Sequence, residues 1–291
     1  MISIILCSRK QNIPESLKEN IAGSIGVEYE LVVIDNSQNT YSILSAYNEG
    51  VSRAKYEYLC FMHDDILYHT QNWGEKVIAH FEDKKVGVIG VGGCHFLSKY
   101  PVSLVSWELA ERNKFYSFNY IQVYKENDIV KSEMFNNFHQ YSVNAVALDG
   151  MWFCMRRDLF EQRVLKFDEI NFNGFHFYDF DICMQVHALK METKIISDIL
   201  IEHYSTGSFD KTWYDNAFVF YKKWKENLPI SIGLNLSEEE LQNIEYDLVM
   251  EFIKSSVDLQ DNLKGQLQSV HKSKRYRLGR FILSPFNWLK K

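Results

Sequence analysis

The run Tyr58-Leu59-Cys60-Phe61-Met62-His63-Asp64-Asp65 joins an apolar segment to a strongly polar end. Its first five residues are apolar, and a short continuous apolar run is typical of a strand buried on both faces. Two adjacent carboxylates, Asp64 and Asp65, end the run, and they repel each other unless they share a cation. Carboxylate oxygens suit Mg²⁺ or Mn²⁺. The alternative is that the pair caps the next helix, whose N-terminus attracts negative charge.

Similar apolar runs lie on either side of this one. Residues 2–7, 30–35 and 86–90 have the pattern of buried strands, and residues 41–55 and 73–81 have the pattern of helices. Residues 92–141 are rich in aromatic side chains and are expected to be irregular. Strands that alternate with helices predict a largely parallel sheet with crossover helices, which is an α/β fold. Ligands of such sheets bind beyond the carboxyl ends of the strands.

Polar residues stand at those predicted strand ends. Ser8 follows the first strand, and Asp35 and Asn36 follow the second. An acidic residue at the position of Asp35 can accept a hydrogen bond from a ribose hydroxyl or a base. The motifs GxGxxG, GxxxxGK[ST], HExxH and GxSxG do not occur, which argues against dinucleotide redox chemistry, Walker-type hydrolysis, zinc proteolysis and serine hydrolysis.

A second acidic cluster, Asp179 and Asp181, lies at the start of a predicted helix that extends to residue 189. One carboxylate close to a bound acceptor hydroxyl can act as its general base, although Asp is also common at helix N-caps. His203 precedes the small polar run Ser205-Thr206-Gly207-Ser208, which suits contact with a phosphate group. A single histidine in such a place is more often structural than a ligand.

The chain has 291 residues with 38 acidic and 32 basic side chains, a net charge of −6, so we expect no nucleic acid among its partners. Its five cysteines are far apart, which disfavours disulfides and zinc sites and indicates thiols in a reducing compartment. The N-terminal apolar run is too short for a signal peptide, and no stretch is long enough to span a membrane. We therefore expect a cytoplasmic protein that binds at most to the inner surface of the plasma membrane.

The C-terminal part has a different pattern. Ser237 and Glu240 form a capping box, and apolar residues then recur every three or four positions up to Val270. This pattern predicts one long amphipathic helix or a helical hairpin. Residues 271–291 carry seven Lys or Arg and no acid, interleaved with large apolar residues, which suits the surface of an anionic membrane. The tail could equally cover an acidic face, or pair two chains into a homodimer through the preceding helix.

The order of these segments resembles that of the family 2 glycosyltransferases, bacterial inverting enzymes with the GT-A fold, over about residues 1–210. The resemblance is carried by residues 2–8, 31–37, 46–54 and 58–65. It implies a mixed sheet of the nucleotide-diphospho-sugar transferase type with flanking helices, followed by a helical extension. The domains expected are a catalytic domain (residues 1–225), a helical extension (226–270) and a basic amphipathic tail (271–291).

The resemblance also implies roles for single residues. Residues 63–65 stand where the family has its DxD motif. Asp65 would bind the metal. His63 takes the place of the first Asp, and His63 and Asp64 would contact the donor. Tyr178-Asp179-Phe180-Asp181 resembles the family's E-D-x-D motif, with Tyr178 in place of Glu, and Asp179 would be the base. Asp181 would position that base or hold the helix start. His203 resembles the late histidine that reaches the metal or the diphosphate, and Ser8, Asp35 and Asn36 would contact the nucleotide.

The function implied is inverting transfer of a sugar from a nucleotide-diphosphate sugar to a hydroxyl of a glycan or a lipid-linked acceptor, as in polysaccharide biosynthesis. The cofactor would be a divalent metal, Mn²⁺ or Mg²⁺. Two alternatives remain. A nucleotidyltransferase also uses a sheet, a carboxylate pair and Mg²⁺, although no glycine-rich basic loop follows the first strand. A catalytically degenerate sugar-nucleotide-binding assembly protein is the other, because His63 and Tyr178 depart from the family motifs.

Overall fold

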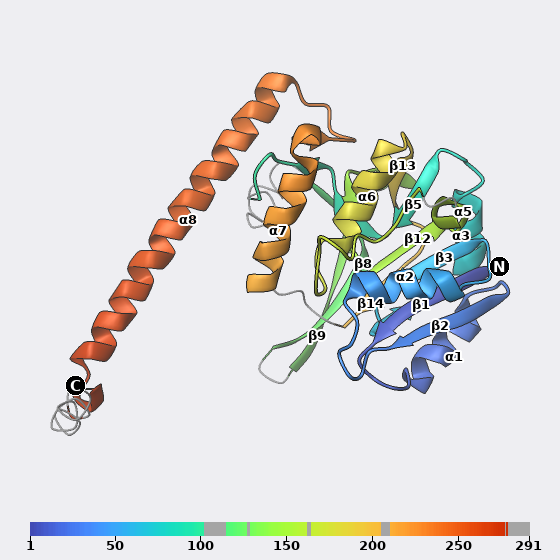
Figure 1. The fold of residues 1–291 in the computed structure, drawn as a ribbon, viewed down its shortest axis with the longest axis horizontal. Coiled ribbons are helices and arrows are strands. Elements are labelled where there is room, and N and C mark those ends of the chain that lie inside the picture. The colour runs from blue at the N-terminus through green and yellow to red at the C-terminus, as the bar shows by residue number, and fades with distance from the viewer. Residues whose placement is uncertain (102–114, 127–128, 162–163, 205–209, 277, 279–291) are drawn as a thin grey trace.

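The computed structural model has a central mixed sheet flanked by helices, with a long C-terminal helix that extends away from the body (Figure 1). It describes residues 1–101, 115–126, 129–161, 164–204, 210–276 and 278. The central sheet has seven strands in the order β10-β13-β5-β12-β3-β1-β2. Their bounds are β1 Ile2–Ser8, β2 Tyr29–Asp35, β3 Tyr58–Met62, β5 Val86–Gly90, β10 Ser142–Asn144, β12 Trp152–Arg156 and β13 Glu192–Ile196.

The predicted α/β class with a mixed sheet and flanking helices is confirmed. β1 pairs in parallel with β2 and β3, and β13 pairs in parallel with β5, whereas β12 runs antiparallel between β3 and β5. Strand β3 covers the residues predicted from its apolar run, and β5 does so as well. The helices among the described residues of this part are α1 Glu15–Ser24, α2 Ile43–Arg53, α3 Trp73–His80, α5 Asp158–Glu161 and α6 Tyr178–Ala188.

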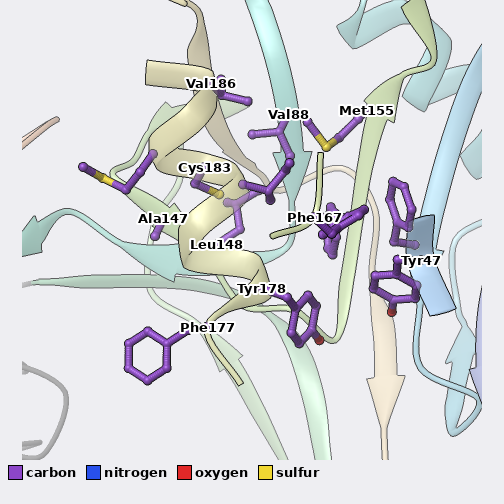
Figure 2. Packing of buried hydrophobic residues seen from close by; sticks show 14 of the residues in the cluster. Tyr47, Val88, Ala147, Leu148, Met155, Phe167, Phe177, Tyr178, Cys183 and Val186 are labelled. Atoms are coloured by element: carbon purple, nitrogen blue, oxygen red, sulfur yellow. The ribbon is translucent and has the colours of Figure 1, made fainter. Parts of the chain in front are cut away.

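Side chains of alternate residues in the central strands pack into two separate hydrophobic cores, one on each face of the sheet. Phe61 packs with α2 and α6 on one face, whereas Cys60 and Met62 pack with α1 and α3 on the other. Every residue of β3 is buried, as its continuous apolar run predicts. Figure 2 shows the first core, with the ring of Tyr178 extending from the start of α6 into it.

The region between residues 92 and 141 was expected to be irregular, and this expectation was wrong. Its described part contains an antiparallel hairpin of β8 and β9, which forms a second sheet in the order β11-β6-β8-β14-β4 with β9 paired to β8. The bounds are β4 Ile66–Tyr68, β6 Gly92–Cys94, β8 Tyr116–Glu126, β9 Ile129–Asn136, β11 Ala147–Leu148 and β14 Ile201–His203. Aromatic and polar residues alternate along β8, and this period of two is the signal of a half-buried strand.

The C-terminal part contains helix α7 Lys211–Trp224, a 3₁₀ turn at Lys225–Asn227, the short strand β15 Ile230–Ser231 and helix α8 Glu238–Lys272. Strand β15 pairs with β7 Phe96–Leu97. Of the two arrangements predicted, α8 is a single long helix rather than a hairpin, and its capping box is present: Glu240 N donates to Ser237 Oγ at 3.2 Å. Near its start, Leu248 packs on Phe96 and Phe115.

Residues 277 and 279–291, which include most of the basic tail, lie outside the described residues, so the contact of the tail with a membrane stays a prediction. None of the helices in the described ranges combines the length and the hydropathy that crossing a membrane requires.

Gly50 of α2 generates a prediction about stability. A Cβ atom there would lie 2.3 Å from Cγ2 of Ile5 in β1, so Gly50→Ala forces the helix away from the sheet. We expect a loss of about 1–3 kcal/mol in the free energy of unfolding, measured by urea denaturation. Gly23→Ala in α1 is the control, because a Cβ there meets nothing within 4 Å, and it should be neutral or stabilising by up to about 1 kcal/mol. Equal effects of the two changes would contradict this account of the packing.

Candidate active site

A cavity of about 920 Å³ opens beyond the carboxyl ends of β1 and β3, where the sequence places its polar residues. Residues 63–65 form one wall, the loop at residues 147–151 and the start of α6 form another, and β8 closes a third side. The side chains that line it and carry charge or bind metals are Arg9, Lys10, His63, Asp64, Asp65, Asp149, His176, Asp179 and His203.

Three of these side chains converge on one point. His63 Nδ1 and His203 Nε2 are 3.3 Å apart, and Asp65 Oδ1 lies 3.6 Å from His203 Nε2 and 4.0 Å from His63 Nδ1. Asp65 Oδ1 is buried and has no hydrogen-bond partner within the described part of the chain. Two imidazole nitrogens and an unpartnered carboxylate oxygen within 4.8 Å of one another are a donor set that fits a divalent metal ion.

The strand ends fix these three side chains. His63 follows β3, and its backbone N–H donates to the carbonyl of Met151 at 2.9 Å. His203 ends β14, which pairs with β4 and β8. Burial, together with the neighbouring His203, lowers the pKa of His63, so its imidazole is neutral near pH 7 and keeps a lone pair for a ligand.

Asp179 lies at the start of α6 and faces the same cavity. Its Oδ2 accepts a hydrogen bond from the backbone N–H of Gly150, and its Oδ1 accepts one from that of Phe180, both at 2.9 Å. Burial at the cavity wall, reinforced by the charge of Asp149, raises the pKa of Asp179 to about 7. A carboxylate with such a pKa matches the requirement for a general base that works near neutral pH.

Asp181 lies two residues further along α6 and points elsewhere. It is 1% exposed and does not line the cavity; it forms an ion pair of 2.8 Å with Lys223 and accepts a hydrogen bond from Trp224 Nε1 at 2.8 Å. These contacts join α6 to the end of α7. Of the two roles that the sequence left for Asp181, the geometry favours holding the start of α6.

The residues predicted to contact the nucleotide are placed in different ways. Asp64 lines the cavity, and its Oδ2 accepts a hydrogen bond from the buried Ser8 hydroxyl, so Ser8 orients Asp64. Asn36 is buried and both ends of its amide bind the backbone of Tyr41. Asp35 is exposed at the end of β2 and accepts a hydrogen bond from Ser37 N at 2.9 Å. Neither Asp35 nor Asn36 lines the cavity.

Sequence reasoning missed the wall formed by β8. Tyr116, Phe118, Tyr120 and Gln122 occur at every second position of this strand and line the cavity together. The alternation of aromatic and polar residues was the signal that could have shown it. Arg9, whose guanidinium lies 4.9 Å from the ring centre of Phe175, also lines the cavity and adds positive charge to it.

The family of the chain follows from a comparison of sequences. Residues 3–232 match the family described as "Glycosyltransferase like family". Since the match covers most of the chain, this protein belongs to that glycosyltransferase-like family. Its membership confirms the resemblance seen in the sequence, and the mixed sheet with flanking helices and a C-terminal helix confirms the predicted fold class. No curated protein sequence matches the chain significantly.

Two solved structures are similar to this chain. The crystal structure of A197 from STIV has 15% sequence identity and a TM-score of 0.40; the match covers 70% of this chain and 86% of that one. The crystal structure of GalNAc-T7 with UDP, GalNAc and Mn²⁺ has 10% identity and a TM-score of 0.49; the match covers 85% of this chain and 54% of that one. Both are distant similarities, and the second involves about half of the other protein's length.

Proposed function

We propose that this protein is a metal-dependent, inverting glycosyltransferase that moves a sugar from a nucleotide-diphosphate sugar to an acceptor hydroxyl. The observation that carries the proposal is that the cluster of His63, Asp65 and His203 opens into the same cavity as Asp179. Metal ligands and a carboxylate with a pKa of about 7 are the two elements that a single displacement at an anomeric carbon needs.

The cluster of His63, Asp65 and His203 would hold a divalent cation, which supplies a Lewis acid for the diphosphate of the donor. Arg9 and Lys10 add positive charge at the same end of the cavity. Asp64, oriented by Ser8, faces the donor. We propose that Asp35, exposed at the end of β2, contacts the nucleotide from outside the cavity, and that Asn36 acts indirectly by holding the backbone at Tyr41.

Asp179 would take the proton from the acceptor hydroxyl as this oxygen attacks the anomeric carbon from the face opposite the diphosphate. The new C–O bond forms as the bond to the diphosphate breaks, and the configuration inverts. The wall of β8 gives the acceptor an aromatic surface, since aromatic rings pack well against the apolar faces of sugars. We propose a glycan or lipid-linked acceptor in the cytoplasm, with residues 271–291 as the contact with the membrane surface.

The first experiment tests the function itself. Incubation with a panel of nucleotide-diphosphate sugars and Mn²⁺ should release the nucleoside diphosphate from one class of donor by slow hydrolysis. Asp65→Asn should abolish this release while the protein stays folded, because a metal–oxygen contact is lost, and excess EDTA should do the same. Full turnover in EDTA would contradict the metal. Consumption of a nucleoside triphosphate with release of diphosphate would indicate a nucleotidyltransferase, and no turnover with any donor would indicate the assembly protein.

A second prediction separates the two aspartates of α6. Asp179→Asn should lower turnover by about 10²–10⁴-fold, the usual contribution of a general base. Since only the ionised carboxylate accepts a proton, wild-type kcat/KM should rise with pH up to about 7 and then level off. Asp181→Asn should affect turnover less but lower the free energy of unfolding by about 1–3 kcal/mol, because it removes the buried negative charge opposite Lys223 and replaces one acceptor oxygen by an NH₂ donor. A larger loss of turnover at Asp181 with unchanged stability would exchange the two roles.

A further inference from the structure

The two departures from the family motifs, His63 and Tyr178, touch each other. His63 Nε2 lies 3.2 Å from the hydroxyl oxygen of Tyr178, and this hydroxyl donates its one proton to the carbonyl of Gly150 at 3.0 Å. Because its proton is already used, the oxygen of Tyr178 can only accept from His63. The imidazole of His63 therefore carries its proton on Nε2, and the lone pair is on Nδ1, the atom that faces Asp65 and His203.

Hydrogen bonds fix the tautomer of the second histidine, His203, in the same way. The amide nitrogen of Gln122 donates to the carbonyl oxygens of His203 and Val123, at 3.1 and 3.0 Å, which leaves Oε1 of Gln122 as an acceptor 3.3 Å from His203 Nδ1. His203 then carries its proton on Nδ1 and directs the lone pair of Nε2 into the cluster. With these tautomers, His63 Nδ1, His203 Nε2 and Asp65 Oδ1 all present lone pairs to one point, and a cation bound there would be held by all three atoms.

We propose that Tyr178 is a positioning residue that fixes the tautomer of His63 and thereby makes His63 a third metal ligand. This inference rests on the proposed function and adds the metal class. Mg²⁺ prefers oxygen ligands and retains its waters, whereas imidazole nitrogen suits first-row transition ions. A site of two imidazoles and one carboxylate therefore selects an ion such as Mn²⁺ over Mg²⁺. Hydrogen bonds to the outer nitrogen of a ligating histidine are known to set its orientation and basicity.

Removal of the hydroxyl tests the proposal. Tyr178→Phe keeps the ring that packs in the core, and its affinity for Mn²⁺ should fall by about 10–100-fold. The measurement is a titration of the full chain with MnCl₂, in which free Mn²⁺ is followed by electron paramagnetic resonance, and Mg²⁺ should compete only in large excess. Tyr47→Phe is the matched control: its ring lies 5.6 Å from that of Tyr178, and its buried hydroxyl has no hydrogen-bond partner among the described residues, so the affinity should not change.

Nitrogen NMR of the metal-free protein gives a second readout. His63 should show the Nε2–H tautomer in the wild type and a mixture of tautomers in Tyr178→Phe, a change that a purely structural role would not produce. Equal Mn²⁺ affinities of the wild type and Tyr178→Phe would overturn the positioning role while leaving the glycosyltransferase proposal intact. A wild type that transfers sugar but binds Mg²⁺ as tightly as Mn²⁺ would overturn the metal class alone. A wild type that binds neither ion would overturn this inference and the metal part of the proposed function together.

Helix α8 has an exposed apolar face. Beyond Leu248, which the body buries, eight large apolar side chains of the helix are exposed, and four of them lie on one face: Phe252 exposed by 38%, Leu259 by 59%, Leu263 by 55% and Val270 by 51%. These four residues are spaced seven, four and seven positions apart, so they form one stripe along the helix. The order of these spacings is the same in both directions along the helix, with its centre at residue 261. Such a stripe is self-complementary in an antiparallel pair, with Phe252 opposite Val270 and Leu259 opposite Leu263.

The charges along α8 favour the same arrangement. From residue 238 to 251 the helix has six acidic residues and no basic one, whereas residues 264–275 have four Lys or Arg and no acid. A parallel pair would place like charges side by side. An antiparallel pair centred at residue 261 instead places Asp247 and Glu251 at the level of the second copy's Arg275 and His271. We infer that α8 binds a second copy of this chain, antiparallel, through the stripe of Phe252, Leu259, Leu263 and Val270.

The mass of the full chain in solution tests this inference by light scattering over a range of concentrations. The wild type should be a dimer, and the double change Leu259→Asp and Leu263→Asp should make it a monomer. Val257→Asp is the control, since Val257 is 49% exposed on the opposite side of the helix and should leave the dimer intact. A monomeric wild type would overturn the inference.

Crosslinking tests the direction of the two helices. A mixture of Phe252→Cys and Val270→Cys proteins should form a disulfide-linked pair, because these two positions face each other in the antiparallel arrangement. The five native cysteines are buried or partly buried, so they should compete little. Phe252→Cys alone should not form one. Crosslinking of Phe252→Cys with itself would overturn the antiparallel arrangement.

Discussion

The pairing of β12 with β3 is the constraint on which the site depends. β12 lies antiparallel between β3 and β5, so the loop before it returns to the carboxyl end of β3. There the carbonyl of Met151 accepts from the backbone N–H of His63, and the backbone N–H of Gly150 donates to Asp179. One short loop thus holds the cluster of His63, Asp65 and His203 against the candidate base, and a shift in the register of β12 would separate them.

The same loop shows how the two motif departures fit together physically. The carbonyl of Gly150 accepts the proton of Tyr178, and Tyr178 in turn accepts from His63. A carboxylate at position 63 could not donate to a tyrosine hydroxyl that has already given up its proton, and it would have left that hydroxyl oxygen without a donor. An imidazole at position 63 therefore complements the phenol at position 178 better than a carboxylate would.

How much could be predicted from the sequence depended on the range of the interactions. Strand β3 was predictable because a continuous apolar run implies burial on both faces. The place of the acidic pair at the end of this strand followed from its position directly after the run. The hairpin of β8 and β9 was missed because a surplus of aromatic residues was interpreted as irregular structure, although its period of two was visible. The different surroundings of Asp179 and Asp181 could not be predicted, since the contacts with Gly150 and Lys223 join residues far apart in the chain.

The position of Asp179 has a cost to the fold that its proposed role as a base would explain. Because burial raises its pKa to about 7, the folded chain binds this proton more tightly than the unfolded chain does. The contribution of Asp179 to stability therefore decreases as the pH rises from the ordinary range of a carboxylic acid through about 7. Two backbone N–H donors reduce this cost without removing it. An aspartate that served only as a helix cap would gain nothing from such an environment, whereas a base that must accept a proton near neutral pH depends on it.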